Sequence, residues 1–139
     1  MQEALVEAKK AFAKDEVPVG AVVVYEGRII GRGHNLVETL QDSAAHAEML
    51  AINAAANFLA SWRLEDCILY TTLEPCIMCA GAILLSRIPV IVYGAPDPRY
   101  GACGTRLQIV DNESLDVQAK IVEGVMQQEC RDLIKEFFK

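Results

Sequence analysis

Residues 67–93 read CILYTTLEPCIMCAGAILLSRIPVIVY, and this stretch decides the fold. The apolar run at 67–72 has the length of a short buried strand, and so has the run at 90–93. Between them, residues 76–85 are apolar on every side, which predicts a buried helix, and Pro75 suits the first helical position. Strand, helix and strand in quick succession predict a βαβ unit whose two strands are parallel.

The residues before this unit predict a helix and a hairpin. Apolar side chains in residues 2–14 recur at helical spacing. The β-branched run at 19–25 and the run at 28–33 flank Glu26-Gly27, which is a turn signal. The two runs therefore predict an antiparallel pair of strands.

An alanine-rich helix is expected next. Asp42 or Ser43 is able to cap a helix that begins at about Ala44 and runs through Ala56. Small side chains along it would allow close packing on a sheet. Its expected buried face consists of Met49, Ile52 and Ala56.

The remaining residues complete the fold class. Residues 94–105 are rich in Gly and Pro and predict a loop, whereas residues 119–122 predict a weak strand. The chain ends in a predicted helix whose apolar stripe consists of Met126, Cys130, Leu133 and Phe137. Together these elements predict one α/β domain over residues 1–139, with three α/β/α layers and a mixed five-stranded sheet covered by helices on both faces.

Composition limits the possible functions. The chain has 139 residues, of which 53% are hydrophobic and 23% charged, so disorder is not expected. No apolar run approaches the roughly 20 residues that span a bilayer, and acidic residues in the opening turn argue against a signal peptide. We therefore expect a cytoplasmic protein with no membrane partner. The net charge of −6 disfavours general binding to nucleic acid.

Two short motifs carry the chemistry, His46-Ala47-Glu48 and Pro75-Cys76-Ile77-Met78-Cys79. Each begins an expected helix. Cys76 and Cys79 are three apart, so both thiols lie on one face of the first turn, where the helix dipole favours the thiolate. Side chains at a helix start tilt back towards its N-terminus, so His46 and Glu48 are able to address one site beyond the helix end.

A Cys-x-x-Cys pair also occurs as a redox pair, as half of a structural zinc site, or simply as two buried thiols. A structural four-cysteine site would need a second pair, but Cys67, Cys103 and Cys130 are scattered, and we assign them no function. Three protein ligands would leave the fourth tetrahedral position of zinc open to water, whose pKa the metal lowers. A carboxylate beside that water, outside the ligand sphere, is suited to carry protons.

These motifs resemble the H-x-E and P-C-x-x-C signature of zinc deaminases. With the flanking stretches, the chain is similar to the tRNA-specific adenosine deaminases, a bacterial family of the cytidine deaminase superfamily that converts the wobble adenosine of an anticodon to inosine. The similarity runs from about residue 3 to the end. It is carried by VPVGAVVV (17–24), GHN (33–35), AHAE (45–48), TLEPCIMCAGAI (72–83), RIPVIVYGA (87–95), GACGT (101–105) and EGVMQQECRDLIKEFF (123–138).

The resemblance implies a cytidine-deaminase-like fold and one zinc ion per subunit, held by His46, Cys76 and Cys79. Glu48 would then shuttle protons from the activated water to the ring nitrogen of adenine and to the departing amine. Taken alone, His46 also fits a capping or core histidine, and Glu48 a first-turn acid placed to favour the helix dipole. The implied partners are a tRNA anticodon stem-loop and a second copy of the chain in a homodimer.

The resemblance also places two residues, Asn35 and Asp97, beside the substrate, and a third candidate follows from its residue type. In the family, the residue matching Asn35 hydrogen-bonds the target nucleotide, although an asparagine at a strand end also forms turns. Asp97 matches a loop that lies along the substrate backbone, and between two prolines it equally suits a turn. Tyr100 is able to stack on a base or to cover the edge of the core.

Two departures from the family pattern and the acidic charge bear on how RNA would be bound. Asp116-Val117 stands where an Asn-His pair is usual, and Asp42-Ser43 where Asp-Pro is usual; neither touches the metal motif. Because phosphate neutralisation supports RNA binding, we expect a local basic rim, although each candidate is also an ordinary surface charge. The candidates are Arg28, Arg32, Arg99, Arg106, Lys135 and Lys139.

Two other functions remain open. A deaminase of a free base or nucleoside, of cytosine or guanine type, would use the same zinc and glutamate and would suit an acidic protein. The stretches at 101–105 and 123–138 argue against it. A non-catalytic zinc-binding scaffold subunit would be expected to lose the proton shuttle or to block the open zinc position, whereas this chain retains Glu48.

Overall fold

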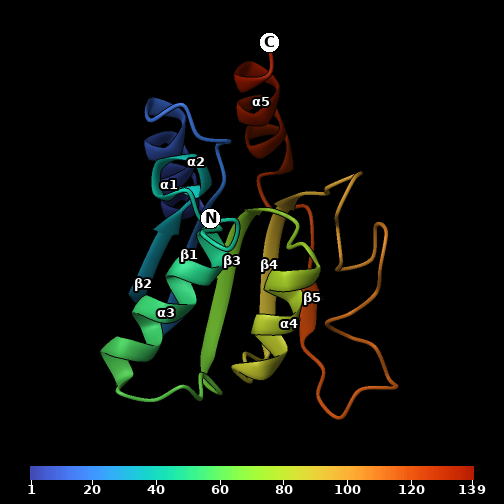
Figure 1. Ribbon diagram of the computed structural model, residues 1–139. Helices are drawn as coiled ribbons and strands as arrows, with labels where there is room; N and C mark the ends of the chain where they lie inside the picture. The colour runs from blue at the N-terminus through green and yellow to red at the C-terminus, as the bar shows by residue number, and fades with distance from the viewer.

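One sheet organises the protein in the computed structural model, which describes residues 1–139. The strands are β1 (Gly20–Tyr25), β2 (Arg28–His34), β3 (Cys67–Leu73), β4 (Val90–Ala95) and β5 (Lys120–Val122). Their order is β2-β1-β3-β4-β5. The β1 strand runs antiparallel to β2 and β3, and β4 runs parallel to β3 and β5. The expected hairpin, βαβ unit and mixed five-stranded sheet are confirmed (Figure 1).

Helices cover both faces of this sheet. They are α1 (Gln2–Ala13), α2 (Val37–Leu40), α3 (Ala47–Leu59), α4 (Ile77–Leu85) and α5 (Gln127–Phe137). In Figure 1, α3 and α4 cross the near face. The α1 and α5 helices lie against the other face and meet through Phe12 and Phe137, whose ring centroids are 5.8 Å apart. None of the helices has the length and apolar character that crossing a membrane requires.

Two glycines of β2 let α3 lie directly on the sheet. A Cβ atom at Gly31 would stand 2.3 Å from the carbonyl oxygen of Ala51, and one at Gly33 would stand 2.4 Å from that of Ala47. Only a residue without a side chain fits at these distances. The facing alanines of α3, including Ala55, are fully buried. This close approach sets where the first turn of α3 lies.

The α3 helix begins three residues later than expected. Asp42 does not cap it; its Oδ1 accepts a hydrogen bond from the N–H of Ala44 within a turn, 2.9 Å long. His46 occupies the N-cap position, and the helix starts at Ala47. The expected buried face is correct only for Ile52, because the glycines of β2 draw the small residues to the sheet. The buried residues of α3 are Ala47, Glu48, Ala51, Ile52 and Ala55.

The expectation that α4 is buried on every side is wrong. Ile77 is 60% exposed and Leu85 is 71% exposed, although both are large and apolar. A helix in an outer layer has only one face on the sheet, and here that face is formed by other residues. The helix also begins one residue later than expected: Cys76 is its N-cap, and Pro75 precedes the cap.

A buried carboxylate joins α1 to the edge of the sheet. Glu7 is 3% exposed, and its oxygens lie 2.7 Å from Nζ of Lys10, 3.3 Å from Nη1 of Arg32 and 3.1 Å from Nδ1 of His34. Burial alone would raise the pKa of Glu7, but hydrogen bonds from these three groups lower it overall. The ion pairs therefore stabilise the ionised carboxylate inside the α1–β2 contact.

The glycine contact predicts a steric effect on stability. We expect Gly33→Ala to lower the free energy of unfolding by about 1 to 3 kcal/mol, because backbone cannot move aside as a side chain can. Gly81→Ala is the matched control: a Cβ there meets nothing within 4 Å, and alanine should favour α4 by about 0.5 to 1 kcal/mol. Urea denaturation at one protein concentration measures both. Wild-type stability in Gly33→Ala would contradict the close approach.

The Glu7 network predicts a pH dependence. Because its folded pKa is below the ordinary value of 4.5, Glu7 contributes stability above that pH and loses it as the pH falls further. Glu7→Gln should cost about 1 to 2 kcal/mol at neutral pH and reduce the loss of stability on acidification. Urea denaturation between neutral pH and pH values below 4.5 checks this. If the free energy of unfolding fell with decreasing pH as steeply in Glu7→Gln as in the wild-type protein, Glu7 would not be the source of that pH dependence.

Candidate active site

Two helix N-termini meet beyond the same end of the sheet. His46 is the N-cap of α3, Cys76 is the N-cap of α4, and Cys79 lies in the first turn of α4. Nδ1 of His46 lies 3.6 Å from Sγ of each cysteine, and the three donor atoms lie within 4.8 Å of one another. The His46 side chain makes no capping hydrogen bond. The structure thus brings together the three residues that the sequence singled out as metal ligands.

The geometry and chemistry of this cluster fit a zinc ion. In a tetrahedral zinc site the bonded nitrogen and sulphur atoms stand about 3.6 Å apart, and the observed separations are 3.6 Å. One imidazole and two thiolates are common zinc donors and leave a fourth position for water. The other cysteines lie buried outside the cluster: Cys67, Cys103 and Cys130.

The two thiols of the cluster are not equivalent. Hydrogen bonds from Cys79 and His46 lower the pKa of Cys76, which favours the thiolate form of this sulphur. Donating a hydrogen bond to Cys76, together with burial, raises the pKa of Cys79. The hydrogen bond to Cys76 also raises the pKa of His46. A divalent cation that binds here would therefore displace protons from Cys79 and His46.

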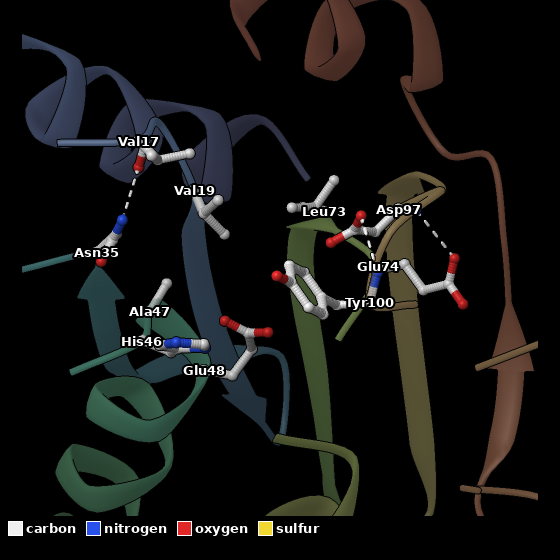
Figure 2. A pocket seen from close by; sticks show the side chains of 10 residues that line it. All are labelled: Val17, Val19, Asn35, His46, Ala47, Glu48, Leu73, Glu74, Asp97 and Tyr100. Atoms are coloured by element: carbon white, nitrogen blue, oxygen red, sulfur yellow. Dashed lines mark hydrogen bonds between the residues drawn. The ribbon is translucent and has the colours of Figure 1, made fainter. Parts of the chain in front are cut away.

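Glu48 is the second residue of α3 and lies in its first turn, beside His46 in Figure 2. It is 3% exposed, and Figure 2 shows its carboxylate pointing into the space between the two sides of the pocket. Burial raises its pKa to about 7. A carboxyl group with that pKa both accepts and donates protons readily at neutral pH, as general acid–base chemistry requires.

A pocket of about 250 Å³ opens over His46 and Glu48. One wall carries Asn35, and the opposite wall carries Asp97 and Tyr100 (Figure 2). The full lining is Val17, Val19, Asn35, His46, Ala47, Glu48, Leu73, Glu74, Asp97 and Tyr100. All of the predicted site residues except the two thiols line this pocket, and His46 links it to the thiols.

Asn35 and Asp97 both line the pocket and shape their own turns. The Asn35 amide donates to the carbonyl oxygen of Val17 at 3.2 Å and accepts from the N–H of Val37 at 3.1 Å. Oδ1 of Asp97 accepts from the N–H groups of Arg99 at 2.9 Å and Tyr100 at 3.3 Å. The turn-forming alternatives are therefore present in the structure, and substrate binding by these two residues stays a prediction.

The basic residues near the pocket agree with those expected only in part: Arg99 and Lys135 are among them. Arg32 is paired with Glu3 and Glu7 on the α1 side of the sheet, and Arg28 begins β2 at the end away from Asn35. A second hollow, of about 500 Å³, shares Val17, Leu73, Asp97 and Tyr100 with the pocket and is lined by the cations Arg99, Arg131 and Lys135. Arg131 was missed because nothing in its helical spacing links it to a loop far away in sequence.

Sequence reasoning also missed two buried acids behind the pocket walls, Glu16 and Glu74, each 1% exposed. Glu74 lines the pocket, and Figure 2 shows its hydrogen bond to Asp97. Its place between a strand and the Pro-Cys motif was the only available signal. Glu16 had none beyond being an acid next to an apolar strand.

The known proteins that this chain resembles in sequence are deaminases. The family model of MafB19-like deaminases matches residues 1–130. The tRNA-specific adenosine deaminase of Bacillus subtilis strain 168 is 52% identical over 139 residues, which are all of this chain and 86% of that protein. The enzyme of the same name from Aquifex aeolicus strain VF5 is 48% identical, over all of this chain and 91% of that protein.

Solved structures of deaminases also match this fold. One structure, from work on A-to-I editing by tRNA:A34 deaminases at the wobble position of transfer RNA, matches with a TM-score of 0.92 and 41% identity over 96% of each chain. Guanine deaminase from Nitrosomonas europaea matches with a TM-score of 0.84 and 25% identity, over 98% of this chain and 81% of that one. The expected deaminase-like fold is therefore confirmed.

The cluster predicts metal binding that depends on three side chains. The purified protein should contain about one equivalent of zinc, and His46→Ala, Cys76→Ala and Cys79→Ala should each reduce it at least about tenfold, since every variant removes a ligand. Cys103→Ala is the matched control, because it removes a buried thiol outside the cluster. Elemental analysis after dialysis measures the metal. Full zinc content in the Cys76→Ala variant would exclude this cluster.

Proposed function

The chain belongs to the tRNA-specific adenosine deaminase family, and from this membership we propose that it hydrolyses the 6-amino group of the wobble adenosine in a tRNA anticodon loop, producing inosine and ammonia. One observation supports the chemistry above all: a buried carboxyl group, Glu48, faces a pocket beside a His-Cys-Cys cluster. An identity of 52% with a tRNA-specific adenosine deaminase over the whole chain supports the substrate.

We assign His46, Cys76 and Cys79 as the ligands of one zinc ion per subunit. When bound, the ion would supply Lewis-acid activation of a water molecule. The lowered pKa of Cys76 favours the thiolate that a metal ion requires. Because the three donors come from two helix ends that are fixed against the sheet, little rearrangement is needed to hold the ion.

Glu48 carries the protons in the proposed reaction. It takes one proton from the attacking water, whose oxygen forms a bond to C6 of adenine, and passes that proton to N1. It then takes the remaining proton of the new hydroxyl group and passes it to the amino group. The C6–N bond breaks, ammonia leaves, and C6 keeps the oxygen as a carbonyl. The pKa of Glu48, about 7, suits both directions of transfer.

The walls of the pocket would orient the base. We assign Asn35 and Asp97 as substrate-binding residues and Tyr100 as a surface on which a base stacks. Extruding a base from a loop costs less than extruding it from a duplex, which favours an anticodon loop. Arg99, Arg131 and Lys135 in the neighbouring hollow would attract its phosphates in spite of the net charge of −6.

We further propose that residues 1–139 form one zinc-dependent deaminase domain that works as a homodimer. The exposed apolar side chains of Ile77 and Leu85 on α4 support this, since large apolar groups gathered on an outer helix favour association. The retained Glu48 and the three-donor metal cluster argue against a scaffold subunit without activity. The likeness to a guanine deaminase keeps a free base as the alternative substrate.

A panel of substrates tests this function. Zinc-loaded protein is offered an anticodon stem-loop with a wobble adenosine, the same loop with a wobble guanosine, free adenosine, guanine and cytosine, and ammonia release is measured. We expect turnover of the adenosine stem-loop alone, and a fall in kcat of at least about a thousandfold in Glu48→Gln because the proton carrier is lost. Unchanged zinc content in that variant is the control. Turnover of guanine without turnover of the stem-loop would contradict the proposed RNA substrate but would leave the proposed deamination chemistry in place.

A further inference from the structure

Behind each wall of the pocket stands one buried carboxylate that the proposed chemistry does not use. Glu16 precedes Val17 and β1, and Glu74 follows β3. Each is 1% exposed. Glu16 accepts hydrogen bonds from the short helix α2, and Glu74 accepts them from the loop at 97–105. Burying a carboxylate is costly unless donors surround it, so the donors at these two positions indicate what each acid does.

Glu74 holds the wall that carries Asp97 and Tyr100. One of its oxygens accepts from the N–H of Asp97 at 3.1 Å, and the other accepts from the N–H of Cys103 at 2.9 Å and of Thr105 at 3.2 Å. The Thr105 hydroxyl donates a further hydrogen bond. The segment from 97 to 105 is therefore wrapped around a single side chain.

The 97–105 segment approaches the Glu74 carboxylate closely at Gly101. A Cβ atom at Gly101 would stand 2.5 Å from the Glu74 carboxyl group, so the loop closes over it. The N–H of Ala102 also donates to the carbonyl oxygen of Pro75 at 2.9 Å, next to the metal motif. The position of Tyr100 relative to the cluster is thus set from the strand end that leads into Cys76.

Glu16 holds the opposite wall in the same way. Its oxygens accept from the N–H of Glu38 at 3.1 Å and from the N–H and hydroxyl of Thr39, both at 2.6 Å. These donors belong to α2, the four-residue helix that follows Asn35. The N–H of Asn35 donates to the carbonyl oxygen of Val19 at 3.1 Å, so this wall is fixed at two points to the segment that precedes β1.

We propose that Glu16 and Glu74 are positioning residues for the deaminase reaction, each holding one wall of the pocket at the distance from Glu48 that the substrate needs. As a statement about catalysis, this rests on the function proposed above. Neither carboxylate touches the substrate; both act through the loops that do. Misplacing a reacting group by about 1 Å costs on the order of a hundredfold in rate, so loss of either anchor lowers catalysis even in a folded, metal-loaded protein.

The first experiment needs no substrate. Glutamine has nearly the shape of glutamate but turns an NH₂ group towards donors, so Glu74→Gln should break contacts with the 97–105 segment only. Amide hydrogen exchange at Asp97, Cys103 and Thr105 should accelerate at least about tenfold, with exchange at Glu38 and Thr39 unchanged. Glu16→Gln should give the converse pattern. Uniform acceleration, or none, overturns the assignment of one wall to each acid.

A matched control separates positioning from stability. Glu7 is similarly buried, at 3% exposure, and its carboxylate is also surrounded by donors, but it lies in the α1–β2 contact and is not part of the pocket lining. Glu7→Gln should lower stability while leaving kcat/KM and the exchange of both walls unchanged. If Glu74→Gln proves unable to fold, Thr105→Val removes one donor from an exposed residue and should give the same pattern more weakly.

Kinetics then test the link to catalysis on whichever substrate the wild-type protein deaminates. Glu74→Gln should lower kcat/KM by about ten- to a hundredfold with zinc content unchanged. In a Tyr100→Ala background the same change should have little further effect, because both act through one wall. Additive effects, or a full kcat/KM in Glu74→Gln, overturn the proposal. Absence of turnover by the wild-type protein would overturn the proposed function instead, and the catalytic role with it, while the exchange data still decide the anchoring.

Discussion

The close contact between α3 and β2 is the constraint on which the site depends. The carbonyl groups of α3 lie against Gly31 and Gly33, and this brings the helix N-terminus level with the end of the sheet. The parallel β3–β4 pair places the N-terminus of α4 at the same end, because a right-handed crossover leaves its helix start above the strand that precedes it. Two positive helix ends therefore point at one spot, which favours anionic sulphur there.

The two parts of the site are held by different kinds of interaction. The cluster of His46, Cys76 and Cys79 is held by backbone packing of helices on a sheet, which resists displacement because a packed interior has few alternatives. The walls of the pocket are loops, held by hydrogen bonds to Glu16 and Glu74. Such contacts open more readily than a packed core. The arrangement joins a cluster held by packing to walls held mainly by a few hydrogen bonds.

Much of this could be predicted from the sequence because it is local. Strand and helix spacing predicted the mixed sheet, and His46-Ala47-Glu48 and Pro-Cys-x-x-Cys each marked a helix start. That the two helix starts hold one metal site was predicted from the resemblance to a family, because His46 and Cys76 are 30 residues apart. The predictions that were wrong concern features that depend on contacts between segments distant in sequence. The start of α3 is set by glycines on another strand, Arg32 is neutralised by α1, and the outer face of α4 shows its apolar side chains only once the layers are stacked. The anchoring acids carry no periodic signal at all.

Anchoring each wall through a single scaffold side chain has a consequence for how such proteins diversify. Glu74 holds the 97–105 segment through backbone N–H groups. The side chains that face the pocket, such as that of Tyr100, take no part in these hydrogen bonds. Substitutions at such positions therefore leave the anchor of the segment in place. The side chains that face the pocket are able to change while the sheet and the two helix ends keep the geometry of the cluster.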